Sequence, residues 1–154
     1  CRRSQVDEEQ PVAICSLKRF AADRARALGA MTQPKPKAPT GKKVAVVGAG
    51  PAGLACAQEL RRAGHAVVVF DARKQPGGLT TFAIAQYKLR PDTALAEAKT
   101  ILDLGVELRT GVAVGKDLSF EQLARDFDHV FPPSLEWKTP RSACGPHVWP
   151  RAAT

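Results

Sequence analysis

Apolar positions recur with two different periods along the chain, and these periods divide it into a helical segment and an α/β region. Residues 11–28 predict an amphipathic helix, because Pro11 suits a first turn and apolar side chains follow at helical spacing. This stripe comprises Leu17, Phe20, Ala21, Arg24 and Leu28. Arg24 fits the stripe if its stem packs while its charge reaches water, or if the helix is only partly buried. Gly29 is expected to end the helix.

The α/β region begins with residues 44–47, a continuously apolar run that is typical of a parallel strand covered on both faces. The other expected elements are a helix over 52–63, a strand over 66–70, a helix over 91–104, a strand over 106–109, a helix over 119–126 with Ser119 as its N-cap, and the start of a strand over 129–131. The helical side chains expected to face the core are Leu54, Ala57, Leu60, Leu95, Ala98, Ile101 and Leu102. Right-handed crossovers then predict an incomplete Rossmann-like α/β domain with a parallel sheet of order 3-2-1-4.

Proline-rich stretches punctuate this pattern. Residues 33–41 alternate proline with lysine, which favours an extended, solvated linker. We therefore expect a helical segment over 1–29, a linker over 30–43, the α/β domain over 44–131 and an irregular tail over 132–154. The last 23 residues hold five prolines and both tryptophans. Two interpretations of this tail stay open: a genuine irregular tail, or an end that is not the natural continuation, for example after a reading-frame error.

Length and composition fit one soluble domain with an appendage, since the chain has 154 residues of which 44% are hydrophobic and 25% charged. The sequence opens with Cys1 and its only methionine is Met31, so we expect that a segment has been lost upstream and that the chain is a fragment. No apolar run approaches the roughly 20 residues of a membrane span, and no signal peptide is visible. A cytoplasmic location without membrane association is expected.

The net charge of +8 raises the question of nucleic-acid binding. The lysines, however, cluster in the proline-rich linker and the arginines of the tail are scattered, so no basic helix face or aromatic platform arises, and nucleic acid is not an expected partner. The four cysteines at positions 1, 15, 56 and 144 form no C-x-x-C pair. Reduced thiols are the simplest interpretation of them.

The motif with the clearest chemistry is a glycine-rich turn between the first expected strand and its helix. It consists of Gly48, Ala49, Gly50, Pro51, Ala52 and Gly53. Gly48 allows the tight turn, Gly50 leaves room for a pyrophosphate against the backbone, and Gly53 lets helix and strand pack closely. The helix N-terminus offers unpaired N–H groups and partial positive charge to the phosphates. This context predicts a dinucleotide site rather than a turn of structural use only.

Two further features accompany the turn. Asp71 stands at the end of the second strand, 18 residues after Gly53, where its carboxylate can accept the hydroxyls of an adenosine ribose. It would repel a 2′-phosphate, so NADP is not expected at this particular site. Gly77, Gly78 and Leu79 follow, and the paired glycines either bring the backbone past the cofactor a second time or form a simple turn. These residues alone leave FAD and NAD both open.

The same residues resemble a known family. Residues 44–71, 77–79, 87–89 and 105–111 are similar to the small (β) subunit of NADPH-dependent glutamate synthase and to the corresponding half of dihydropyrimidine dehydrogenase. The similarity extends upstream through residues 11–14 and 17–21, and it covers roughly residues 1–131. The resemblance implies a helical domain with two [4Fe–4S] clusters followed by FAD and NADPH domains, with electrons passing from NADPH through FAD and the clusters to a partner flavin.

Carried over by position, the resemblance implies FAD contacts at the turn and beyond. These are Gly48, Ala49, Gly50, Pro51, Ala52, Asp71, Gly78, Leu79, Lys88 and Val114. Cys1 corresponds to a cluster-binding cysteine and so resembles an iron–sulfur ligand. Lys18 stands where some members have a Gln or Glu ligand, and an ammonium has no lone pair for iron. Cys15 is either a substitute ligand or a plain helix cysteine, and Cys56 is expected to pack in the core.

The chain also departs from this family. Its last expected strand meets Pro132 and Pro133, the second glycine fingerprint for NADPH is absent, and no residue is a candidate acid, base or nucleophile. We therefore expect an FAD-binding fragment of an NAD(P)H-dependent flavin and iron–sulfur oxidoreductase, inactive alone, whose parent works with a larger catalytic subunit or domain. Two alternatives stay open: an NAD-binding module of another oxidoreductase or regulator, and a non-catalytic interaction fragment.

Overall fold

The computed structural model describes residues 12–30 and 33–132. The chain divides into two compact units, Cys1–Pro34 and Lys35–Thr154, so the division falls inside the linker expected from the prolines. Three expectations concern residues outside the described ranges: the tail after Pro132, the position of Pro11 in a first helical turn, and Cys1 as a cluster ligand.

The described part of the first unit is a single helix, α1, over Ile14–Ala27. It ends as expected, since Gly29 has a φ of +64° and the amides of Leu28 and Gly29 donate to the carbonyls of Arg24 and Arg26. No residue of α1 is buried, and Leu17, Phe20 and Leu28 of the apolar stripe are exposed. The stripe is therefore uncovered within the described residues of this unit.

The second unit is built on a sheet of four parallel strands. They are β1 (Lys43–Val47), β2 (Ala66–Asp71), β3 (Glu107–Thr110) and β4 (His129–Phe131). Their order is β3-β2-β1-β4, which confirms the order expected from the sequence. The apolar run of β1 is buried because β1 lies in the middle of the sheet, paired with β2 on one side and β4 on the other.

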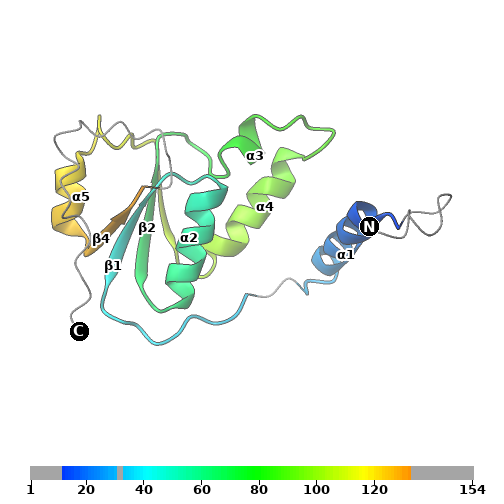
Figure 1. Cartoon of the computed structure of the whole chain (residues 1–154), viewed down its shortest axis with the longest axis horizontal. Coiled ribbons are helices and arrows are strands. Elements are labelled where there is room, and N and C mark those ends of the chain that lie inside the picture. Colours follow the sequence, from blue (N-terminus) through cyan, green and yellow to red (C-terminus); the bar gives the residue numbers. More distant parts are fainter. Residues whose placement is uncertain (1–11, 31–32, 133–154) are drawn as a thin grey trace. The chain divides into compact units, whose positions relative to one another are not determined.

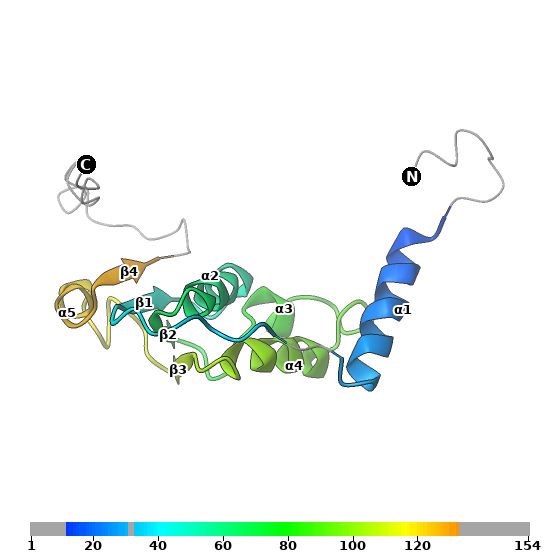
Figure 2. The same cartoon turned by 90° about the horizontal axis from the view of Figure 1, so that it is seen from below.

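Helices cover both faces of this sheet (Figures 1 and 2). Helices α2 (Pro51–Arg62) and α4 (Pro91–Leu102) pack on one face, and α5 (Phe120–Asp126) packs on the other. Successive strand residues alternate between the two faces, so Val46 and Val69 meet α2 and α4, while Phe70 meets Leu123 of α5. Of the helical residues expected to face the core, Leu54, Ala57 and Ala98 are buried, and Leu60, Ile101 and Leu102 pack against the same cluster.

Most element boundaries lie within two residues of those expected, but α1 begins at Ile14 rather than at residue 11. Helix α4 ends at Leu102 rather than at residue 104, because the chain turns at Gly105, whose φ is +92°. Ser119 caps α5 as expected, and Gln122 completes a capping box by bonding back to the Ser119 amide. A four-residue helix, α3 (Leu79–Phe82), was not expected, since it is too short to give a periodic pattern. None of the helices described is both long enough and apolar enough to span a bilayer.

The end of the expected linker is attached to the second unit. The Lys37 amide donates to the Arg62 carbonyl at 3.0 Å, and the Thr40 amide donates to the Gly64 carbonyl at 3.0 Å. A side chain at Gly64 would collide with the Ala38 carbonyl. Residues 37–40 therefore follow the end of α2 instead of running freely through solvent.

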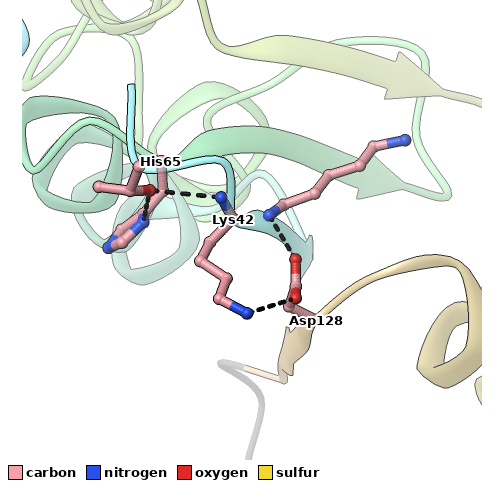
Figure 3. A network of polar contacts seen from close by, with 5 residues as sticks. Lys42, His65 and Asp128 are labelled. Carbon is pink, nitrogen blue, oxygen red and sulfur yellow. Dashed lines mark hydrogen bonds and ion pairs between the residues drawn. The ribbon is translucent and has the colours of Figure 1, made fainter. Parts of the chain in front are cut away.

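A polar network then joins this segment to the amino ends of β1 and β4 (Figure 3). Thr40 Oγ1 lies 2.6 Å from His65 Nδ1, and the Asp128 carboxylate accepts the Lys43 amide at 2.8 Å and Lys42 Nζ at 3.0 Å. Both hydrogen bonds to Asp128 lower the pKa of its carboxyl. The bond from the Lys43 amide has the larger effect, and the bond from the Lys42 side chain has the smaller one. Asp128 thus links the first residues of the central strand to the strand at the edge.

We expect the Asp128→Ala variant to melt at a lower temperature than the wild type at pH 7. A lowered folded-state pKa gives stability that is present above the unfolded value of about 4 and is lost as pH falls through the folded value. The difference in melting temperature should therefore shrink as the pH is lowered below about 4. Thermal melts followed by circular dichroism from pH 7 to pH 2.5 would measure it. As a control, Lys42→Ala should lower the melting temperature less than Asp128→Ala does, because the ion pair of Lys42 with Asp128 is solvent-exposed. A difference that stays constant across this pH range would contradict the prediction.

Candidate dinucleotide site

The glycine-rich turn lies at the carboxyl end of β1, where the chain bends into α2. Gly48 has a φ of +106°, which an L side chain rarely adopts, and its amide donates to the Phe70 carbonyl of β2 at 2.6 Å. Gly50 is the N-cap of α2, and Pro51 occupies its first turn. This is the strand, turn and helix arrangement expected from the sequence.

Gly50 and Gly53 differ in what surrounds them. A Cβ at Gly53 would collide with the Gly48 carbonyl oxygen, so this glycine lets α2 approach the end of β1. A Cβ at Gly50 would meet no atom within 4 Å. Internal packing thus explains Gly53, whereas Gly50 faces open space beside the turn. The open side of Gly50 is where a ligand can come against the main chain.

The first turn of α2 offers main-chain donors to such a ligand. The Leu54 amide is the first to bond to a carbonyl of the turn, donating to Gly50 at 2.9 Å. No side chain caps the helix, and the preceding amides of Ala52 and Gly53 have no main-chain acceptor among the described residues. Together with the partial positive charge of the helix end, these N–H groups suit a diphosphate.

Asp71, the last residue of β2, lies at the mouth of the turn. Its Oδ2 accepts the Ala49 amide at 2.6 Å, and its Oδ1 accepts the Arg73 amide at 2.7 Å. Each carboxylate oxygen keeps a second lone pair that can accept a further hydrogen bond. The position expected for an adenosine ribose contact is therefore occupied by an acid directed at the turn.

The paired glycines approach the turn from its other side. The Gly77 amide donates to the Ala49 carbonyl at 2.7 Å, and a Cβ at Gly78 would come within 2.9 Å of Gly50 Cα. Gly77 and Gly78 have φ values of +107° and +56°. The structure therefore brings the chain past the glycine turn a second time, and Leu79 begins α3 there with its side chain exposed.

The two remaining expected contacts lie on loops. Lys88 is exposed in the turn after α3, with Nζ 5.7 Å from the centre of the Tyr87 ring. Val114 lies after β3 and packs on the Phe70 side of the sheet. The chain reaches Val114 by passing Asp71, because the Val112 amide donates to the Asp71 carbonyl at 3.0 Å. The turn, Asp71 and the paired glycines are linked by hydrogen bonds, whereas no such bond joins Lys88 to them among the described residues.

Arg73 is a neighbour of the site that the sequence patterns did not single out. Besides its amide bond to Asp71, its guanidinium lies 4.6 Å from the centre of the Phe82 ring. The only sequence signal was its position two residues after the acid at the strand end. Arg73 joins α3 to the loop that follows β2.

The cysteines give no metal site within the described residues. No group of three or more His, Cys, Asp or Glu side chains is placed there to hold a metal ion. Cys15 is exposed on α1, whereas Cys56 packs beside the α2 and α4 core cluster as expected, and burial raises the pKa of its thiol. The prediction for Cys1 falls outside the described residues.

Known proteins share this arrangement and sequence. A family model described as an NAD(P)-binding Rossmann-like domain matches residues 46–108. The fold is similar to that of FprA from Mycobacterium tuberculosis in complex with NADPH, with a TM-score of 0.55 and 20% identity over 59% of this chain and 22% of that one. At this identity the likeness shows the fold alone.

Comparison of sequences finds relatives with a higher identity than FprA. The glutamate synthase [NADPH] small chain of Escherichia coli (strain K12) is 39% identical over 125 residues, which are 81% of this chain and 26% of that protein. The NADP(+)-dependent formate dehydrogenase subunit beta of Moorella thermoacetica is 39% identical over 152 residues, 85% of this chain and 21% of that protein. The chain is therefore a homologue of the glutamate synthase small chain and of related NADP-dependent oxidoreductases, and it spans about a quarter of the length of the small chain.

Proposed function

We propose that residues 44–131 are the FAD-binding part of an NAD(P)H-dependent oxidoreductase in which electrons pass from NADPH through FAD to iron–sulfur clusters. The observation that carries the proposal is the Asp71 carboxylate, held by the Ala49 amide at the mouth of a glycine turn whose Gly50 faces open space. An acid for the adenosine ribose and bare amides for the diphosphate thus stand side by side.

The residues of this chain fit the group that the proposal requires. The first turn of α2 would hold the diphosphate, Asp71 the ribose, and the paired glycines Gly77 and Gly78 would let the main chain pass close to the ligand. FAD, when bound, supplies the redox chemistry, accepting a hydride and releasing electrons singly. The chain contributes position and a preformed set of donors, and none of the residues of the site is needed as an acid or a base.

The remaining components of the reaction would lie on other parts of a longer protein or on a partner. The two sequence relatives are about four and about five times longer than the matched region, since it covers 26% of the first and 21% of the second, and one is named for NADPH and the other for NADP(+). In the proposed reaction a larger catalytic subunit or domain accepts the electrons. Cys1, at the start of the sequence, would contribute to an iron–sulfur cluster with cysteines that this chain does not contain.

The family model favours a second candidate function, an NAD-binding module, because its description names NAD(P) and it covers the turn and Asp71. The two functions share the adenosine and diphosphate contacts and differ in the rest of the ligand. The paired glycines are packed against Gly50 and would let the main chain pass close to the diphosphate of either ligand, so direct titration with FAD and NADH separates the two functions.

Flavin titration of the purified 154-residue chain tests the proposal. We expect the chain to retain FAD through gel filtration, with flavin absorbance at about 450 nm. It should bind FAD more tightly than FMN, which lacks the adenosine and the diphosphate. NADH should compete at least about ten-fold more weakly than FAD. Binding of NADH without retention of FAD would establish the second candidate instead.

A further inference from the structure

The Ala49 peptide group lies at the centre of the candidate site. Its N–H donates to Asp71 Oδ2 at 2.6 Å, and its carbonyl accepts the Gly77 amide at 2.7 Å. One residue of the glycine turn is therefore joined to the end of β2 and to the paired-glycine loop. We call these two hydrogen bonds the Ala49 bridge.

The carboxylate end of the Ala49 bridge is fixed on both oxygens. Asp71 Oδ1 accepts the Arg73 amide at 2.7 Å while Oδ2 accepts Ala49, so both partners are main-chain groups. A side chain held by two main-chain amides has little freedom to rotate. The carboxylate is thus oriented by the protein before any ribose is present.

Burial makes the Ala49 bridge important to the turn. Ala49 is fully buried, and a buried amide without an acceptor is costly. Asp71 is the acceptor that this amide has. On the other side, Gly78 lies against Gly50, so a shift of the Ala49 peptide would also move the loop that borders the open side of Gly50.

We propose that Asp71 is a positioning residue as well as a ribose ligand: its carboxylate holds the Ala49 peptide and thereby sets the glycine turn and the paired-glycine loop before a dinucleotide binds. The inference rests on the proposed function only in that a diphosphate occupies the turn. Each Asp71 oxygen still has a lone pair for a ribose hydroxyl, so the two roles are compatible.

Ligands with and without ribose hydroxyls separate the two roles. In Asp71→Ala, the Ala49 amide and the Arg73 amide both lose their carboxylate acceptor, so the Asp71 end of the Ala49 bridge is removed. If Asp71 acts only on the ribose, this variant should bind 2′,3′-dideoxy-ADP as well as the wild type does. If Asp71 positions the turn, the variant should bind dideoxy-ADP at least about ten-fold more weakly, and ADP more weakly still.

Titration calorimetry of the full 154-residue chain with ADP and with dideoxy-ADP would measure these affinities. The matched control is Asp103→Ala, which removes an exposed acid that pairs with Lys99 at the end of α4, and it should leave both affinities unchanged. Unchanged affinity of Asp71→Ala for dideoxy-ADP, with weakened ADP binding, would overturn the positioning role.

Amide hydrogen exchange of the ligand-free chain provides a second measurement that needs no ligand. The Ala49 and Gly77 amides should exchange at least about ten-fold faster in Asp71→Ala, while the core amides of Val46 and Val69 keep their protection. Unchanged exchange at Ala49 would refute the inference. If the wild-type chain binds neither ADP nor FAD, the proposed function fails, and the exchange rates still decide whether Asp71 positions the turn.

Discussion

Replacing Gly53 by alanine should lower the free energy of unfolding by about 3 kcal/mol, a large part of the stability of a domain of this size. The new methyl group would collide with the Gly48 carbonyl oxygen and would lie beside Val46, which is fully buried in the central strand. Relief would require α2 to move away from β1 and so disturb the core cluster formed by Leu54 and Ala57.

Urea denaturation followed by circular dichroism would measure the loss in Gly53→Ala. The matched control is Ala55→Ser, an exposed position in the next turn of α2, which should change the unfolding free energy by less than about 0.5 kcal/mol. A Gly53→Ala variant as stable as the wild type would show that α2 does not approach the turn as closely as described.

Replacing Gly50 by alanine should have the opposite effect to Gly53→Ala: the fold should be unchanged, and cofactor binding should be strongly weakened. Gly50 has a φ of −75° and a ψ of 179°, which alanine adopts easily, and its Cβ would meet no protein atom within 4 Å. The methyl group would instead fill the space in which the diphosphate approaches the main chain. We expect FAD affinity to fall about 100-fold, equivalent to about 3 kcal/mol.

The same flavin titration used for the wild-type chain would measure this affinity, and a thermal melt would establish that the fold is intact. The melting temperature of Gly50→Ala should stay within a few degrees of that of the wild type, because the restriction of the unfolded chain by alanine offsets the loss of a favoured N-cap residue. Equal FAD affinity in the two proteins would place the diphosphate elsewhere and remove the main support for the proposed site.

The pair Gly50 and Gly53 also illustrates how far the sequence could be interpreted by itself. The spacing of the glycines after an apolar run, followed by an acid 18 residues after the third, was enough to predict the strand, turn, helix and strand around them. The sequence also predicted different roles for the two glycines. The folded chain added the atoms involved, since a Cβ at Gly53 would collide with the Gly48 carbonyl oxygen and a Cβ at Gly50 would meet no atom within 4 Å.

Other features were beyond the sequence because they depend on main-chain geometry. The four residues of α3 give no period to detect, and their helix follows from the positive φ angles of Gly77 and Gly78. The attachment of residues 37–40 to the end of α2 depends on main-chain amides and carbonyls, which every linker possesses. Composition had suggested only that this stretch is extended and solvated.

The sequence by itself determined the α/β class, the strand order and the residues of the glycine turn, because hydrophobic periods and glycine spacing are local and crossover handedness leaves few topologies. Only the tertiary structure decided that Asp71 binds the Ala49 amide and that Gly77 binds the Ala49 carbonyl. Those bonds join segments more than 20 residues apart, and their geometry is set by how the strands and α2 pack together.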